Sequence, residues 1–264
     1  MQYFGCKRDK KDNRDYLMRA YLPVVKIPKK IDYTMKMTLV RDQGDEGTCV
    51  GFASTVGMKE YQEKIDYRKY ITLSPRFLYS ECKKVDKSPG EGTTIRTAMK
   101  VLKKKGVCKE DYWPYMPHQK NKAKTGAVTN AKKFRVLTYA RIVDLYELKL
   151  NLATKGPCVI GIEVFRGMMD ARNGRVPMPK KGERVLGGHA ICPVGYDDAK
   201  GLVKFKNSWS SMWGDKGYGY LPYKYIDKYM MDAWSAVDVI DSQPLTIKKI
   251  LNVQESKSSR FKSK

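Results

Sequence analysis

The apolar residues of the first half of the chain recur at three- and four-residue steps. From Cys49 to Ile65 they fall on one helical face, and Thr48 stands where an N-cap would lie. A second run from Thr94 to Lys105 has the same period and is closed by Gly106, a residue suited to ending a helix. The pattern therefore predicts that the first half is helical.

After a polar stretch near residues 115–132 the pattern changes to short runs typical of β-strands, bounded by Gly, Pro, Asp and Asn. One helix is expected near Val143–Leu152. The expected strands are Phe134–Tyr139, Cys158–Val164, His189–Tyr196, Leu202–Asn207 and Tyr218–Leu221.

Three segments follow from these patterns: an extension at 1–26, a domain at 27–240 and a tail at 241–264. The domain divides into a helical half at about 27–120 and a β half at about 121–240. The Ser- and Lys-rich tail cannot bury enough surface to offset its ordering entropy, so we expect its end to be mobile.

The strong positive charge of the chain is compatible with several classes of partner and does not identify one. The 264 residues carry a formal net charge of +24, which attracts polyanions and disfavours self-association. Nucleic acid or another polyanion is thus a possible partner of a monomer, although scattered lysines on solvated faces explain the charge more simply. No apolar run is long enough to span a membrane, and the charged N-terminus does not resemble a secretory signal.

Cysteine and histidine spacing gives little support for a metal site. The six cysteines form no C-x-x-C pairs, and neither of the two histidines lies near a second soft ligand at zinc-like spacing. We therefore expect mostly free thiols, no metal and no cofactor. A disulfide-poor chain favours the cytoplasm or another intracellular compartment.

The stretch RDQGDEGTCVGFAS places Cys49 on the first turn of the first helix. Unpaired N–H groups and the helix dipole there would lower the thiol pKa and favour a nucleophilic thiolate. The alternative is a small buried apolar residue at a helix start. His189 and Asn207 follow Cys49 at about 140 and 158 residues, close to the spacing of a cysteine nucleophile with its histidine and asparagine.

These residues give the chain a resemblance to the papain-like (C1) cysteine peptidases. Gln43 precedes Cys49 by six positions, as in that family, and Asn207-Ser208-Trp209 followed by Trp213-Gly214 is the most specific match. The resemblance covers about Ile27 to Ile240. It implies an α+β fold in which a helical subdomain faces an antiparallel, β-barrel-like subdomain across an active-site cleft.

The resemblance also implies roles. Cys49 would be the nucleophile, His189 its base and then the acid, Asn207 the residue orienting the imidazole, and Gln43 an oxyanion-hole donor. Trp209 would shield the His189–Asn207 contact. The substrate would lie against a glycine edge at Gly92 and in a pocket formed by Gly161, Gly188 and Ala190, where Glu163 could add a preference for Lys or Arg.

Three positions depart from the family pattern: Glu46 and Val50 replace a common cysteine and tryptophan, and Ser210 a common glycine. With only about 26 residues ahead of the resemblance, no long helical inhibitory segment is expected.

The leading hypothesis is a thiol endopeptidase acting on peptides or proteins through an acyl-enzyme. An exopeptidase, amidase or transferase could use the same residues. A catalytically silent protein that binds an acidic partner or nucleic acid is the alternative from another class.

Overall fold

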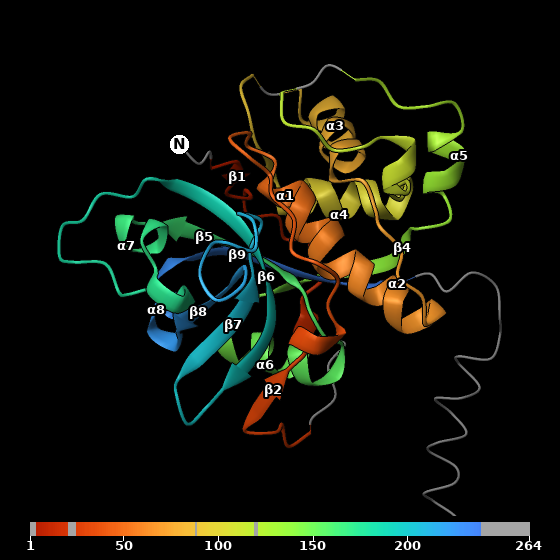
Figure 1. Ribbon diagram of the computed structural model, residues 1–264. Coiled ribbons are helices and arrows are strands. Elements are labelled where there is room, and N and C mark those ends of the chain that lie inside the picture. Colours follow the sequence, from red (N-terminus) through yellow and green to blue (C-terminus); the bar gives the residue numbers. More distant parts are fainter. Residues whose placement is uncertain (1–3, 21–24, 88, 119–120, 239–264) are drawn as a thin grey trace, which may run out of the picture.

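The computed structural model describes residues 4–20, 25–87, 89–118 and 121–238. A helical half faces an antiparallel sheet, which is the α+β arrangement that the sequence predicts (Figure 1). The tail at 241–264, predicted to be mobile, lies outside the described residues.

One rod of three helices carries Cys49 at its first position. It consists of α1 (Cys49–Phe52), a π-helix (Ala53–Lys59) and α2 (Glu60–Tyr67). Thr48 is the N-cap residue, as the sequence predicts, but its side chain makes no cap hydrogen bond. Its hydroxyl instead lies 2.8 Å from the Tyr115 hydroxyl.

Two further helices pack behind this rod. In α3 (Pro75–Asp86), which the sequence analysis did not predict, Ser74 caps the first turn; in α4 (Ile95–Lys104) Thr94 does so. Gly106 follows α4 with φ +80°, the left-handed conformation that glycine adopts readily. The short α5 spans Ala127–Ala131.

The sheet runs in the order β4–β9–β5–β6–β7–β8, and β2 (Lys30–Asp32) also pairs with β6. Within the described residues β4 and β8 are end strands, so the antiparallel sheet expected for this half is open and is not a closed barrel. The bounds of the six strands in chain order are Val136–Ile142, Val159–Val164, Gly187–Asp197, Leu202–Lys206, Tyr218–Pro222 and Met230–Asp238.

Helices on the sheet side complete this half. They are α6 (Leu145–Thr154), α7 (Arg166–Met169) and α8 (Tyr223–Tyr229), and Asp144 caps α6 by accepting from the Glu147 N–H. Single 3₁₀ turns occur at Met18–Ala20, Thr34–Lys36, Glu110–Tyr112 and Arg172–Gly174.

The two larger of the three apolar clusters lie on opposite faces of the sheet. One joins α3 and α4 to β9 through Trp234, and the other joins α6 and α8 to strands β5 to β8. All six cysteines are buried and unbridged. None of the described helices is long and apolar enough to cross a bilayer.

The first described residues, from Phe4 onward, lie where the two halves meet. Strand β1 (Cys6–Lys7) pairs in parallel with β3 (Thr93–Thr94), just before α4, and Figure 1 shows β1 in dark red beside α1. We call residues 4–15 the N-terminal segment.

Candidate active site

Cys49 is fully buried at the start of α1. Burial raises the pKa of the Cys49 thiol, although the nearby backbone N–H groups of Ala190, Gly5 and Val50 favour the thiolate. The lowered pKa predicted from helix position is therefore wrong for this conformation, in which the sulfur has no access to water.

His189, on β6, is held by Asn207 at the end of β7. Its Nε2 lies 2.8 Å from Asn207 Oδ1, which also accepts the Ser208 N–H at 2.8 Å. Because Oδ1 is the acceptor in both contacts, Nε2 must be the donor. Nδ1 is buried without a hydrogen-bond partner in the described part of the chain, so it is the ring nitrogen left for a thiol proton.

Burial sets the protonation state of the His189 imidazole, and Trp209 packs against its ring. Burial lowers the pKa of His189 to about 4, although the contact with Asn207 opposes the shift. Trp209 stacks on the ring, with centroids 4.5 Å apart and an interplanar angle of 28°, and covers the contact with Asn207 from one side. The imidazole is therefore neutral near pH 7.

Gln43 lies between the Cys49 loop and the Asn207 strand. Its side-chain Nε2 donates to the Glu46 carbonyl at 2.9 Å, and its Oε1 accepts from the Ser208 hydroxyl at 2.6 Å. A backbone bond from its N–H to the Ser208 carbonyl, 2.9 Å long, adds a third tie. The orientation of the Gln43 amide is thus set from both halves of the molecule.

Glu46, which replaces the cysteine common in the family, forms a two-pronged ion pair with Arg76 on α3. The N–O distances are 2.6 and 2.5 Å, and both side chains are largely buried. The Arg76 guanidinium also stacks on the Tyr115 ring, whose hydroxyl donates to the Gln43 carbonyl. This ion pair ties the loop of Gln43 and Cys49 to α3.

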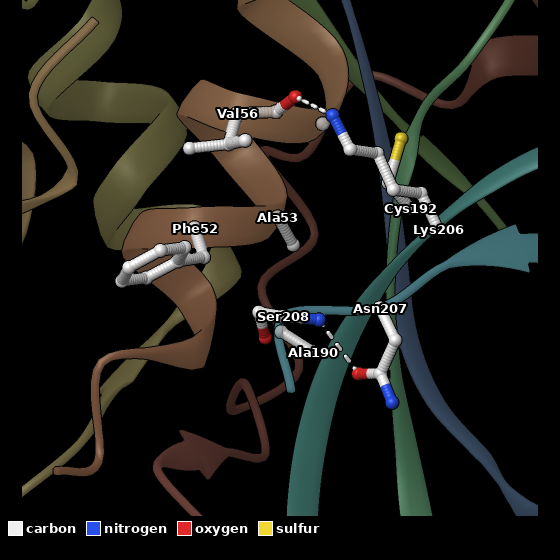
Figure 2. Close-up of a pocket in the computed structure, with 9 residues that line it drawn as sticks. Phe52, Ala53, Val56, Ala190, Cys192, Lys206, Asn207 and Ser208 are labelled. Atoms are coloured by element: carbon white, nitrogen blue, oxygen red, sulfur yellow. Dashed lines mark hydrogen bonds between the residues drawn. The ribbon is translucent and has the colours of Figure 1, made fainter. Parts of the chain in front are cut away.

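Behind the site, a small cavity lies where β6 and β7 meet the rod of helices (Figure 2). The sheet side of the cavity is lined by Ala190, Asn207 and Ser208, and the helix side by Phe52, Ala53, Val56 and Gly57. The Lys206 ammonium, beside Asn207, donates to the Val56 carbonyl of the π-helix at 2.8 Å. Burial lowers the pKa of Lys206 to about 8.

The N-terminal segment fills the cleft over these groups. The Phe4 ring lies edge-on to Trp209 and His189, with centroids 6.2 and 6.4 Å away, and the Gly5 carbonyl accepts from the Thr93 N–H at 2.9 Å. Cys6 follows and is buried.

All five predicted substrate-binding residues line this segment or the thiol. A Cβ on Gly92 would overlap the Gly5 carbonyl, and one on Gly188 the Cys6 carbonyl. A Cβ on Gly161 would approach Cys6 Sγ to 2.8 Å. Trp209 contacts Phe4, and the Ala190 backbone N–H lies near the Cys49 thiol and favours its thiolate.

Glu163 and His118 have other partners. Glu163 Oε1 accepts from the Arg8 guanidinium at 3.1 Å. His118 lies on the surface, with Nε2 2.6 Å from Asp45 Oδ1.

Sequence reasoning missed Arg76 and the whole N-terminal segment. The segment reads KRDKKDNRD after Cys6, a pattern typical of a solvated tail, so nothing in it indicates residence in a cleft. Arg76 lies in LSPRFLY, where Ser74-Pro75 is a helix-start signal that indicates α3, but no local pattern places Arg76 near the Cys49 loop.

Residues 27–235 match the papain family cysteine proteases. An uncharacterised peptidase C1-like protein of Acanthamoeba polyphaga mimivirus is 32% identical, over 90% of this chain and 88% of that protein. Cathepsin K of Mus musculus is 30% identical over 74% of this chain, which spans 60% of that protein's length.

Solved structures agree. Xylellain, a cysteine protease from Xylella fastidiosa, superposes with a TM-score of 0.78 at 29% identity, covering 89% of this chain and 96% of that one. A proCathepsin B of Trypanosoma congolense shares the fold, with a TM-score of 0.73 at 15% identity over 90% of this chain and 87% of that one.

The chain therefore belongs to the papain family of cysteine proteases. It is a thiol peptidase, a hydrolase of peptide bonds.

Proposed function

We propose that the chain is an endopeptidase that works through a Cys49–His189–Asn207 acyl-enzyme mechanism. The observation that carries the proposal is the convergence of a helix-terminal thiol, an imidazole oriented by Asn207, and the Gln43 amide at one cleft. Each group has the chemistry that its role needs.

In the reaction His189 Nδ1 takes the thiol proton as Cys49 sulfur attacks the substrate carbonyl. The backbone N–H of Cys49 and the Gln43 amide stabilise the oxyanion; an amide NH₂ has two donors, so it can serve the oxyanion while it holds Glu46. His189 then protonates the leaving amine. Water, deprotonated by the same imidazole, hydrolyses the thioester and restores the thiol.

The path of the N-terminal segment supports the endopeptidase mode. Its backbone passes continuously from Phe4, beside Trp209, over Cys49 to Cys6, beside Gly161. The groove thus accommodates a polypeptide on both sides of the sulfur, whereas an exopeptidase needs one side blocked.

The test is exhaustive digestion of a peptide acetylated at one end and amidated at the other, with products identified by mass spectrometry. Internal cuts that are absent with Cys49→Ala are expected. Release of only single residues or dipeptides from an unblocked version of the peptide, with the blocked one intact, would contradict the endopeptidase mode.

We also expect an apolar or aromatic preference at the second residue before the cut. Ile95 Cδ1 lies 3.3 Å from the Cβ position of Gly161, so the pocket that holds Cys6 has an apolar wall. Profiling of a peptide library measures this preference, and a preference for Asp or Glu there would refute it.

A further inference from the structure

The two donors proposed for the oxyanion lie at opposite ends of one short loop. Gln43 supplies its side-chain amide, and Cys49, further along the same loop, supplies its backbone N–H. An oxyanion hole works only while its donors keep a fixed separation, because each must lie within about 3 Å of the same oxygen. The loop from 43 to 49, which contains Gly44 and Gly47, is therefore part of the catalytic geometry.

The hydroxyl of Tyr115 bridges the two ends of this loop. It donates to the Gln43 carbonyl at 2.7 Å and lies 2.8 Å from the hydroxyl of Thr48, the residue before Cys49. A phenol has one proton, and that proton goes to the carbonyl, so Thr48 is the donor in the second bond. The hydroxyls therefore form a chain from Thr48 through Tyr115 to Gln43, and the bonds of such a chain strengthen one another.

Tyr115 reaches the loop from another part of the helical half, just after the 3₁₀ turn Glu110–Tyr112. Its backbone N–H donates to Glu110 Oε1 at 2.7 Å. Its ring meets Phe52 of α1 edge-on, with centroids 4.6 Å apart, and the Arg76 guanidinium of α3 at 4.7 Å. Burial raises the pKa of Tyr115, so the hydroxyl keeps its proton near pH 7. The position and the protonation of this donor are thus both fixed.

The Gln43 backbone is also tied to the sheet half. Its N–H donates to the Ser208 carbonyl at 2.9 Å, while its carbonyl accepts from Tyr115. The peptide unit before the Gln43 side chain is therefore fixed by the sheet, and the unit after it by the helical half. Loss of the Tyr115 bond would free one of the two peptide units from which the oxyanion donor projects.

We propose that Tyr115 is a positioning residue of the oxyanion hole, whose hydroxyl, bonded to Gln43 and Thr48, sets the separation of the Gln43 amide from the Cys49 N–H. The proposal rests on the proposed function for its activity readout. Because the oxyanion forms only on the way to the acyl-enzyme, the hydroxyl should affect kcat and leave KM unchanged.

Tyr115→Phe in the full chain removes the hydroxyl and keeps the ring. Its kcat on a short fluorogenic peptide should fall about fivefold with KM unchanged, as is usual for one hydrogen bond. The matched control is Tyr196→Phe on β6, because the Tyr196 hydroxyl also donates to a backbone carbonyl, that of Pro28, at 2.6 Å, and its ring also carries a cation, Lys149. The control should keep the parent's kcat. Equal values of kcat in Tyr115→Phe and Tyr196→Phe would overturn the proposal.

Thr48→Val tests whether the two hydroxyls act as one chain, since valine has the shape of threonine without its hydroxyl. Combined with Tyr115→Phe it should reduce kcat little further than Tyr115→Phe alone, because both changes break the same chain. Thr48→Ser, which keeps the hydroxyl, should keep the parent's kcat. Fully additive losses in the double variant would contradict the bridge between the two ends of the loop.

A peptide aldehyde tests the oxyanion hole without turnover. The Cys49 sulfur adds to the aldehyde carbon, the thiol proton passes to the carbonyl oxygen, and that oxygen lies where the oxyanion would form. The dissociation constant, measured by calorimetry, should rise about fivefold in Tyr115→Phe, the same factor as the loss of kcat. Alkylation of Cys49 by iodoacetamide creates no oxyanion and should keep the parent's rate. Slower alkylation in Tyr115→Phe would place the defect at the thiol and overturn the positioning role.

The aldehyde also separates the two proposals. Weaker aldehyde binding in Tyr115→Phe, together with a parent that hydrolyses no peptide, would support the role of Tyr115 and refute the endopeptidase. Equal aldehyde affinity and equal kcat in the parent and Tyr115→Phe would overturn the role of Tyr115 and leave the proposed endopeptidase unaffected.

Discussion

The hydrogen bond between His189 and Asn207 should contribute to kcat, and a substitution can measure that contribution. Asn207 orients the imidazole but forms no bond to the substrate, so Asn207→Ala should reduce kcat and leave residual hydrolysis, whereas Cys49→Ala should abolish it. Gln43→Ala should cost about a hundredfold in kcat, as is usual for an oxyanion-hole donor. Steady-state kinetics of the three proteins beside the parent measures these effects. Full activity of Cys49→Ala would overturn the mechanism.

Two buried groups give the segment opposite responses to pH. Burial and the charge of Asp9 raise the pKa of Asp232 to about 6 from its ordinary 3.8. Arg141, Arg8 and the Asp9 N–H act in the opposite direction. The Cys6 thiol also lies near Asp232. When the N-terminal segment leaves the domain, the charge of Asp9 leaves with it. Asp232 therefore holds its proton more tightly while the segment is bound. Binding of the segment is therefore favoured by acid at Asp232 and weakens as pH rises toward 6.

At His189 the sign is reversed. Burial lowers its pKa to about 4 from 6.5, so the bound state excludes the proton and binding weakens as pH falls from about 6.5 to 4. The two effects oppose each other in nearly the same window, and the parent should show a shallow pH dependence.

Asp232→Asn should unmask the His189 effect, so that the segment opens on acidification. Hydrogen exchange of the segment, corrected for intrinsic rates, measures the opening. A variant that also carries His189→Gln should lose the response, and opening toward alkaline pH in Asp232→Asn would contradict the assignment.

At the scale of elements, the Glu46–Arg76 pair links the Cys49 loop to α3 where relatives commonly have a cysteine. Glu46→Ala would leave a buried guanidinium unpaired, and we expect it to lower the free energy of unfolding by about 3 kcal/mol. It should also lower kcat more than it raises KM, because the Glu46–Arg76 pair fixes the loop whose Glu46 backbone carbonyl holds the Gln43 amide.

The neighbouring Asp45 supplies the control for this variant. Its pair with His118 lies on the surface, so Asp45→Ala should cost less than about 1 kcal/mol. Chemical denaturation measures both variants, and equal stability losses would rule out the special role of the Glu46 pair.

Periodicity predicted the elements that bury one continuous face. The rod from Cys49, α4 and strands β4 to β8 were all expected within a few residues. Strand β9 and helix α3 were missed, because β9 mixes Asp232 and Ser235 with apolar residues and α3 carries charges that find partners only in the fold. Propensity cannot reveal polar residues whose burial depends on distant partners.

At the scale of the whole molecule, the residues of the active site were easier to predict from the sequence than the presence of the N-terminal segment in the cleft. Spacing and the Asn207-Ser208-Trp209 triplet indicated which residues meet, since such motifs are local. The position of the N-terminal segment depends on Asp9 meeting Trp234 and Asp232 more than 220 residues later. No pattern within the segment encodes that contact.

The absence of bridges among the six buried cysteines predicts indifference of the fold to reductant. The melting temperature should be the same with and without dithiothreitol, whereas activity should be preserved or raised because Cys49 stays reduced. Differential scanning calorimetry and intact mass measure this. A mass two hydrogens below the reduced value, with a lower melting temperature on reduction, would contradict it.

A ligand that is part of its own receptor's chain cannot be diluted away. The cleft encounters the N-terminal segment at an effective concentration of roughly millimolar, whatever the amount of protein present. Competition by peptide substrates must therefore overcome a fixed local excess, and dilution of the intact chain should leave its specific activity unchanged. Once the connection between segment and domain is cut, the same contacts become an ordinary bimolecular equilibrium, and dilution should then shift that equilibrium toward an empty cleft.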